Sequence, residues 1–366
     1  MRRVRTWWIW PLAGAALVAS GLVGQAGAVP TGRVPGVPSV TKLQCPSISL
    51  CVGIAGDGVN VPGPNLVMSR APRSGRWVMQ TIDGGRRLRV LTCRSARWCL
   101  AVDQQNRVLI STDPDRGAAS WRRAPGGPGR HLDDVQQLSC PSVHLCVGLA
   151  GHYVVSSVAP QRGGTAWSQR LANPDAPAFT VDCPDSTQCV ATNPDGQLLT
   201  SSDPTGRTAW KLVQLDRSGR NLVSASLSCA SATRCVVAFG DGRVFSTTNL
   251  TASAPTWHQT QLGSSHLPDR AVTLSVSCTT ANVCAAVADG SVWASPAPGR
   301  SGQRRWRRVA SDAGTAGAGD VLDSVACVAG QLCVAVDQAR HVLSSRTITQ
   351  PGSWRRQTIA DPNQNG

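Results

Sequence analysis

The sequence predicts an all-β protein, a seven-bladed β-propeller of four-stranded antiparallel blades with one C-x5-C disulfide in each blade. Cysteines recur in seven pairs with five intervening residues, and one tryptophan follows the first cysteine of each pair after 27 to 32 positions. The repeat period of 43 to 49 residues is that of one propeller blade. The pairs use all fourteen cysteines: Cys45 with Cys51, Cys93 with Cys99, Cys140 with Cys146, Cys183 with Cys189, Cys229 with Cys235, Cys278 with Cys284, and Cys327 with Cys333. The tryptophans are Trp77, Trp121, Trp167, Trp210, Trp257, Trp306 and Trp354.

The first 28 residues are predicted to be a signal peptide. Arg2, Arg3 and Arg5 precede an apolar run, and Ala26-Gly27-Ala28 is a small-residue cleavage signal. An uncleaved N-terminal anchor is the alternative, and only in that case do we expect membrane contact. Residues 29–41 contain three prolines and are predicted to be a linker. A single propeller domain at 42–361 and a C-terminal tail at 362–366 complete the expected organisation.

The cysteines predict disulfides and a secreted, extracellular protein. Paired thiols at fixed spacing in an exported chain form a disulfide framework. Zinc is the competing interpretation, but five intervening residues match zinc-ligand spacing poorly, and a four-ligand site would have to join different blades. The histidines lack metal-ligand spacing as well. We therefore expect no metal and no cofactor.

The pattern of one repeat predicts four short strands. In the third copy these are 135–140, 146–150, 153–157 and 167–171, each with strand-like alternation of apolar residues. The cysteine pair then joins the end of the first strand to the start of the second. Glycine after Asp or Asn recurs between the second and third strands and supplies the positive φ of a tight hairpin. The tryptophans are expected to pack between neighbouring blades.

Two loops resemble the Asp-box motif of BNR-type, sialidase-like propellers. Ser111 to Trp121 and Ser201 to Trp210 are degenerate matches to Ser-x-Asp-x-Gly-x-x-Trp, and the other five copies keep the Trp but lack the Asp. The resemblance implies a turn between the third and fourth strands. It also implies sialidase chemistry, with a tyrosine nucleophile activated by glutamate. Because the chain has no Glu and its one tyrosine, Tyr153, lies in the third repeat, that chemistry is not carried over.

The charge is strongly positive and comes almost entirely from arginine. Removing the three arginines of residues 1–28 lowers the net charge from +15 to +12, and Lys42 and Lys211 are the only lysines. A secreted protein of this charge is attracted to phosphate-bearing wall polymers, acidic glycans or lipid headgroups. No compact basic tract indicates a specific nucleic-acid site. Three copies carry Trp-Arg-Arg on the expected fourth strand, where charge protects an open sheet edge.

The connections from the fourth strand of one blade to the first strand of the next are the most polar segments. They are expected to surround the propeller funnel, where arginines bind carboxylates or phosphates through paired hydrogen bonds. The candidate ligand-binding residues are Arg87, Arg130, Asp134, Arg220, Asp269 and Arg270. Polar surface loops without a ligand are the alternative explanation for this composition.

No catalytic set is found in the sequence. It lacks a G-x-S-x-G nucleophile motif, and the seven cysteine pairs leave no free thiol. The sequence therefore predicts a secreted, monomeric, non-enzymatic binding module whose funnel face recognises an anionic glycan, a wall polymer or a protein. The alternative function is an exo-acting glycoside hydrolase or lyase with an aspartate pair in the funnel. Its candidate aspartates are Asp134, Asp269, Asp320 and Asp323.

Overall fold

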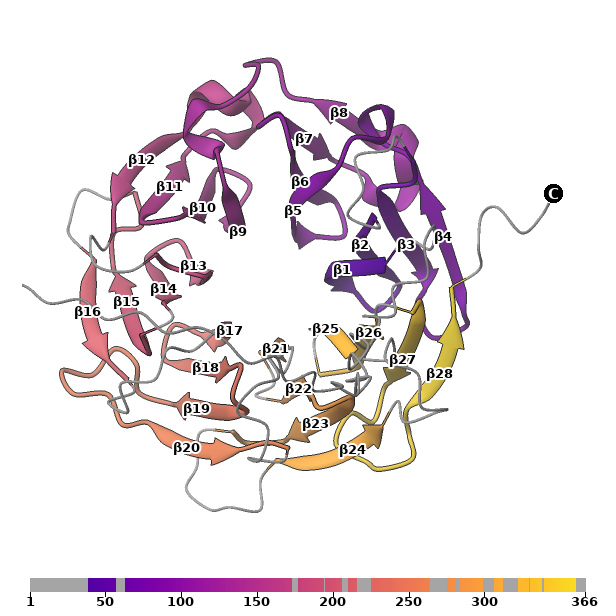
Figure 1. Cartoon of the computed structure of the whole chain (residues 1–366), viewed down its shortest axis with the longest axis vertical. Coiled ribbons are helices and arrows are strands. Elements are labelled where there is room, and N and C mark those ends of the chain that lie inside the picture. The colour runs from indigo at the N-terminus through magenta and orange to yellow at the C-terminus, as the bar shows by residue number, and fades with distance from the viewer. Residues whose placement is uncertain are drawn as a thin grey trace, which may run out of the picture. The chain divides into compact units, whose positions relative to one another are not determined.

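The computed structural model describes residues 39–56, 63–172, 177–193, 195–205, 210–215, 225–263, 275–280, 283–298, 306–311, 322–328, 330–337 and 339–359. All of them belong to one compact unit, Gly32–Gly366. Within this unit seven four-stranded antiparallel sheets form a ring, which confirms the seven-bladed propeller (Figure 1). The predicted signal peptide lies outside the described residues.

Each blade is one continuous stretch of chain, with its strands in sequence order from the centre of the ring to the outside. Blade 1 is β1 (Ser39–Ser47), β2 (Leu50–Gly56), β3 (Leu66–Ala71) and β4 (Arg76–Gln80). Blade 2 is β5 (Leu88–Ser95), β6 (Trp98–Asp103), β7 (Val108–Ser111) and β8 (Trp121–Arg123). Blade 3 is β9 (Val135–Ser142), β10 (Leu145–Ala150), β11 (Tyr153–Ser157) and β12 (Ser168–Leu171).

The remaining four blades repeat this arrangement. Blade 4 is β13 (Thr180–Asp185), β14 (Gln188–Thr192), β15 (Gln197–Ser201) and β16 (Lys211–Gln214). Blade 5 is β17 (Ala225–Ser231), β18 (Arg234–Phe239), β19 (Arg243–Thr247) and β20 (His258–Gln261). Blade 6 is β21 (Ser275–Cys278), β22 (Cys284–Ala288), β23 (Ser291–Ser295) and β24 (Arg307–Ser311). Blade 7 is β25 (Leu322–Val328), β26 (Leu332–Asp337), β27 (His341–Ser345) and β28 (Arg355–Thr358).

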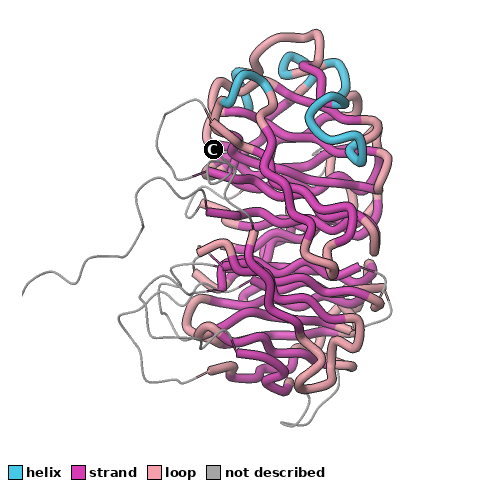
Figure 2. The backbone as a smooth tube through the Cα atoms, turned by 90° about the vertical axis from the view of Figure 1, so that its right-hand side faces the viewer, coloured by secondary structure: helices cyan, strands magenta, loops and turns pink. Residues whose placement is uncertain are grey.

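Short 3-10 turns are the only helical elements in the described part of the chain, and Figure 2 shows them grouped on one part of the ring. They are η1 (Asp83–Gly85), η2 (Pro114–Ser120), η3 (Arg130–Leu132), η4 (Pro160–Arg162) and η5 (Gly164–Ala166). The first strand begins at Ser39, three residues inside the range predicted as linker. It starts there because Val40 is fully buried and pairs with Ala55 of β2.

All seven predicted disulfides are present, and in every blade the bond joins the first hairpin. The bonds connect Cys45 to Cys51, Cys93 to Cys99, Cys140 to Cys146, Cys183 to Cys189, Cys229 to Cys235, Cys278 to Cys284, and Cys327 to Cys333. Each pair has one cysteine on the first strand of its blade and the other on the second strand. The structure therefore confirms the predicted pairing at all fourteen positions.

The register of the first hairpin explains why this spacing forms a disulfide. In blades 2, 5, 6 and 7 the two cysteines are direct antiparallel partners. Cα atoms of directly opposed residues are about 4.5 to 5.5 Å apart in a sheet, close to the separation that a disulfide needs. The C-x5-C spacing therefore closes the hairpin between these two strands.

The hydrophobic core is divided into seven clusters, each lying between two neighbouring blades. Between blades 1 and 2, for example, Leu50 and Met68 pack with Leu91 and Trp121. The periodic tryptophan of each blade belongs to, or packs against, the cluster shared with the preceding blade. This confirms the expectation that the tryptophans pack between blades.

Packing between blades 7 and 1 closes the ring without any exchange of strands. One cluster contains Val40 and Trp77 of blade 1 together with Leu332 and Val342 of blade 7. At the outer side, the Gln357 side-chain amide donates a hydrogen bond to the carbonyl oxygen of Arg73. Contacts made by the two ends of the domain therefore hold the ring together.

Candidate binding face

One face of the ring carries the connections between blades and the turns between second and third strands. Backbone hydrogen bonds join the two kinds of segment. The Gln104 N–H donates to the Arg87 carbonyl at 2.9 Å, and the Gly129 N–H donates to the Asn106 carbonyl at 2.9 Å. This is the surface that the sequence analysis identified as the funnel face, and we keep that name for it.

Three of the six predicted ligand-binding residues lie on the funnel face. Arg87, Arg130 and Asp134 are exposed and belong to the connections that lead into blades 2 and 3. Among the described contacts, no hydrogen bond or ion pair joins these three side chains to one another. Arg220, Asp269 and Arg270 lie outside the described residues, as does Asp320. The structure thus brings Arg130 and Asp134 into one connection and Arg87 into the preceding one.

Arg130 is held by a neighbouring histidine. Its Nε donates to Nε2 of His131 at 3.2 Å, and Nδ1 of His131 lies 2.8 Å from Oε1 of Gln169. Because Nε2 accepts and Nδ1 donates in this arrangement, it fits a neutral imidazole. The two contacts orient the guanidinium of Arg130 on the surface and leave its other N–H groups for a ligand.

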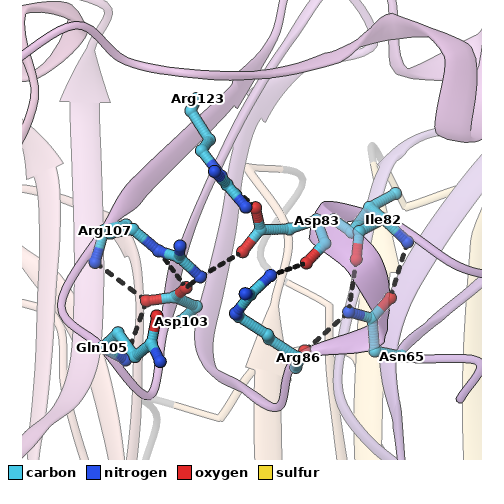
Figure 3. Close-up of polar contacts among 8 residues, drawn as sticks. All are labelled: Asn65, Ile82, Asp83, Arg86, Asp103, Gln105, Arg107 and Arg123. Atoms are coloured by element: carbon cyan, nitrogen blue, oxygen red, sulfur yellow. Dashed lines mark hydrogen bonds and ion pairs between the residues drawn. The ribbon is translucent and has the colours of Figure 1, made fainter. Parts of the chain in front are cut away.

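A buried network of carboxylates and arginines is formed around Asp83, in the connection that leads into blade 2 (Figure 3). The Asp83 and Asp103 side chains are only 1% and 0% exposed, and the guanidinium of Arg107 bridges them. Arg107 Nη2 is 2.8 Å from Oδ2 of Asp83, and Arg107 Nε is 2.7 Å from Oδ2 of Asp103. Arg123, at the end of the outermost strand β8, donates from Nε to the second oxygen of Asp83. A buried charge is stable only when it is paired in this way.

The sequence analysis did not single out this network, although part of its pattern is repeated. In three blades the last residue of the second strand, or the residue just after it, is Asp or Asn. Its side chain accepts the backbone N–H of the residue four positions later. The pairs are Asp103 with Arg107, Asn193 with Gln197, and Asp337 with His341. The motif braces the turn between second and third strands. In blade 2 the contact of Arg107 with Asp83 extends the motif to the connection between blades, and in blade 7 Nη2 of Arg356 lies 3.0 Å from Nδ1 of His341.

The network limits the chemistry that this part of the face can perform. A glycosidase needs two carboxyl groups about 5 to 9.5 Å apart that both reach the substrate. Asp83 and Asp103 are buried and share one arginine between them, so neither is free to act as a nucleophile or as an acid. The buried carboxylates instead fix two arginines, Arg107 and Arg123, and Nη1 of Arg86 donates to the backbone carbonyl oxygen of Asp83 at 3.0 Å.

Side chains on the innermost strands link neighbouring blades. In blades 3 to 6 the residue before the first cysteine accepts a hydrogen bond from the backbone N–H of the first cysteine in the next blade. The acceptors are Ser139 (2.9 Å), Asp182 (2.7 Å), Ser228 (2.9 Å) and Ser277 (2.9 Å). A second level uses the serine two positions earlier: Ser226, Ser275 and Ser324 accept from Val276, Val325 and Leu43. Sequence reasoning treated these residues only as strand positions.

Asp182 replaces serine in this series, and its environment changes its acidity. Burial raises the pKa of Asp182 to about 6, while hydrogen bonds from the Cys229 N–H and the Ser139 hydroxyl act in the opposite direction. Its two oxygens contact both neighbours, with Oδ1 3.2 Å from Ser139 Oγ and Oδ2 2.7 Å from Cys229 N. One carboxyl group therefore connects three consecutive innermost strands.

Lys42 extends from blade 1 to blade 3. Its Nζ donates to the Gln136 carbonyl and to Oε1 of Gln137, both at 3.2 Å. Although the side chain keeps contact with solvent, protein surrounds it, and this burial lowers the pKa of Lys42; the charge of Asp323 opposes the shift. The innermost strands thus carry polar and charged groups toward the centre of the ring.

The described residues contain no group of three His, Cys, Asp or Glu side chains arranged to hold a metal ion. In the same part of the chain, no helix has the length and apolar character required to span a bilayer.

Comparison with known proteins identifies the fold alone. No family model matches the chain, and a search of curated proteins finds no match. Solved structures with the same architecture include U3-55K, with a TM-score of 0.60 and 15% identity over 82% of this chain and 89% of that one. YCF48 from Cyanidioschyzon merolae has a TM-score of 0.58 and 12% identity over 84% of this chain and 94% of its own. The WD40 repeats of RRP9 have a TM-score of 0.59 and 14% identity over 82% of this chain and 88% of that one. The resemblance to Asp-box propellers stays a prediction.

Proposed function

We propose that this protein is an extracellular, non-enzymatic binding module whose funnel face recognises an anionic glycan or wall polymer. One observation carries the proposal: Arg87 and Arg130 are exposed on neighbouring connections, while the nearby carboxylates of Asp83 and Asp103 are buried in internal ion pairs. Asp83 and Asp103 are therefore neutralised inside the protein, while Arg87 and Arg130 face solvent, Arg130 in the same connection as the exposed Asp134.

The chemistry of arginine supports an anionic ligand. A guanidinium presents a planar set of N–H donors that match a carboxylate or phosphate in pairs. The His131 contact and the Asp83 network limit the freedom of these segments before a ligand binds, which reduces the entropy lost on binding. An extracellular location is supported by the seven disulfides, which persist in oxidising compartments.

The test is binding of the full chain, produced in an oxidising compartment, to an array of anionic and neutral glycans at two salt concentrations. We expect salt-sensitive binding to acidic glycans that weakens at least tenfold in the double variant Arg87→Gln/Arg130→Gln. The matched control is Arg97→Gln/Arg234→Gln, which removes two exposed arginines at the hairpins between first and second strands, on the opposite face.

Three results would overturn the proposal. An equal loss of affinity in both double variants would show that binding depends on net charge and not on one face of the ring. If the chain bound no glycan but did bind an acidic protein added as a competitor, the partner would be a protein and not a glycan. Release of sugar from any glycan would show an enzyme.

A further inference from the structure

The outermost strands carry a second basic surface, which adjoins the funnel face at Arg123, the partner of Asp83. Every fourth strand has one open edge, and the described fourth strands contain no Asp at all. Seven exposed arginines lie on the fourth strands of only four blades, β24, β28, β4 and β8. They are Arg307, Arg308, Arg355, Arg356, Arg76, Arg122 and Arg123. We call this set the basic arc.

Ring closure makes the basic arc continuous. Its members come from both ends of the domain, and they become neighbours because blade 7 packs against blade 1. Figure 1 shows β24, β28, β4 and β8 following one another along the outside of the ring. The other three fourth strands, β12, β16 and β20, carry only Arg170 and Lys211, and β20 carries neither arginine nor lysine.

Protection of the open sheet edges does not account for this distribution. A single charge on an edge strand discourages pairing with another chain. All seven fourth strands have the same open edge, yet the arginines gather on four adjacent blades and come in pairs on three of them. The uneven charge therefore requires a second explanation.

Four arginines of the arc are directed away from the hydrophobic core. Arg76, Arg122, Arg307 and Arg355 each lie directly next to the tryptophan of their blade. All four arginines are exposed, whereas the neighbouring tryptophans pack in the hydrophobic clusters between blades. In the described part of the chain none of the four has a carboxylate partner, and Arg122 donates only to the carbonyls of Ala119 and Trp121. Their charge is free to meet a ligand.

We propose that the basic arc binds a linear phosphodiester-linked wall polymer along the circumference of the ring. A row of guanidinium groups on consecutive blades fits a chain with repeating phosphates, each of which accepts paired hydrogen bonds. A flexible chain follows a curved surface that extends over four of seven blades, whereas a flat membrane touches only a small part of it. The four strands expose no aromatic side chain, since Trp77 and Trp121 are buried, so the stacking surface for nucleic-acid bases is missing.

The test uses the full chain and labelled linear polyphosphate, with dissociation constants measured from low to moderate salt. The variant Arg76→Gln/Arg355→Gln removes one arc residue from each of the adjacent blades 1 and 7. Its matched control, Arg170→Gln/Lys211→Gln, removes one basic residue from each of the adjacent blades 3 and 4. We expect about tenfold weaker binding in the arc variant and less than twofold in the control. The slope of log K against log salt should also become less steep by about 1.4, since two phosphate contacts are lost.

Further measurements distinguish a wall polymer from other anionic ligands and the basic arc from the funnel face. Affinity should rise with polyphosphate length, and tripolyphosphate should bind much more weakly than the long chain. An equal loss of affinity in the control variant would show diffuse electrostatic attraction instead of binding at the basic arc. Arc-dependent binding that is equally tight to oligo(dT), or to vesicles rich in phosphatidylserine, would overturn the choice of a wall polymer. A loss of polyphosphate binding in Arg87→Gln/Arg130→Gln alone would assign the ligand to the funnel face. Gel filtration and thermal unfolding show that each variant is folded.

Discussion

The Leu43 backbone N–H donates a hydrogen bond to Oγ of Ser324 at 3.3 Å across 281 residues of sequence. Ser324 lies on the innermost strand of blade 7 and Leu43 on that of blade 1, so the bond spans the closure of the ring. It is buried, and the same type of contact joins blades 5 to 6 and 6 to 7. The closure is therefore one more interface between blades, made by the same kind of bond.

Replacing Ser324 by Ala should destabilise the ring at its closure. The change leaves the buried Leu43 N–H without its acceptor, which costs about 1 to 3 kcal/mol. Urea unfolding measures the loss, and Ser49→Ala, an exposed serine in the first hairpin of blade 1, serves as the control with little expected change. Equal stability of Ser324→Ala and the parent protein would show that hydrophobic packing alone closes the ring.

Removing Arg107 should be far more damaging than removing an arginine from a surface ion pair. Arg107→Ala leaves Asp83 and Asp103 buried without their shared partner, and we expect a loss of about 3 to 5 kcal/mol. Arg70 pairs with Asp115 at 3.3 Å while both side chains are more than half exposed, so Arg70→Ala should cost less than about 1 kcal/mol. The comparison uses the free energy of unfolding in urea. Similar losses in the two variants would contradict the structural role given to the network.

Asp182 should make stability depend on pH in the acidic range. Its native pKa of about 6 lies above that of an exposed aspartate, about 3.9, so the folded state binds the proton more tightly than the unfolded state. The stabilising contribution of this group is complete below about pH 4 and is lost as the pH rises through about 6.

The variant Asp182→Ser introduces the residue that blades 3, 5 and 6 use at this position. Relative to the parent protein, it should gain stability as the pH rises from 4 to 7, because a hydroxyl does not titrate there. Ser228→Ala, which removes a related hydrogen bond without a titrating group, should show a difference that does not change with pH. Thermal unfolding across this range measures both. A constant difference for Asp182→Ser would refute the assignment.

All seven disulfides should be formed, and each one alone should add only modestly to the free energy of unfolding. Alkylation of the unfolded, unreduced protein should modify no cysteine, since all fourteen are paired. Removing one bridge as Cys278→Ala/Cys284→Ala should cost about 2 kcal/mol, because the loop that it closes is short. Mass spectrometry tests the first expectation and urea unfolding the second. A modified cysteine pair in the parent protein would contradict a bridge in every blade.

Much of the fold could be predicted from the sequence because its repeat is local. The Cys-x5-Cys spacing fixes one hairpin in each blade, and the tryptophan fixes the position of the last strand. In the third blade the predicted third strand, 153–157, agrees with β11, and the predicted first strand is two residues shorter than β9. Neighbouring strands joined by a hairpin leave clear periodic patterns in the sequence, so the bounds of these strands could be predicted.

The contacts between blades were not predictable in the same way. Ser139, Ser228 and Ser277 stand at one position of the repeat, but their partners are backbone N–H groups of the next blade, which no strand pattern specifies. The Asp83 network joins three separate segments, and of these contacts only the spacing of Asp103 and Arg107 is repeated. Closure of the ring likewise makes the first and last blades of the domain neighbours. These features depend on tertiary structure rather than on local sequence.

The central claim is binding without turnover at the funnel face, and the most direct measurement is the fate of a bound ligand. The full chain is incubated with the acidic glycan that it binds best, and the ligand is then recovered and its mass determined. We expect an unchanged ligand from the parent protein and at least tenfold weaker binding of the same ligand by Arg87→Gln/Arg130→Gln. A shortened ligand would contradict the claim and direct attention to the aspartates.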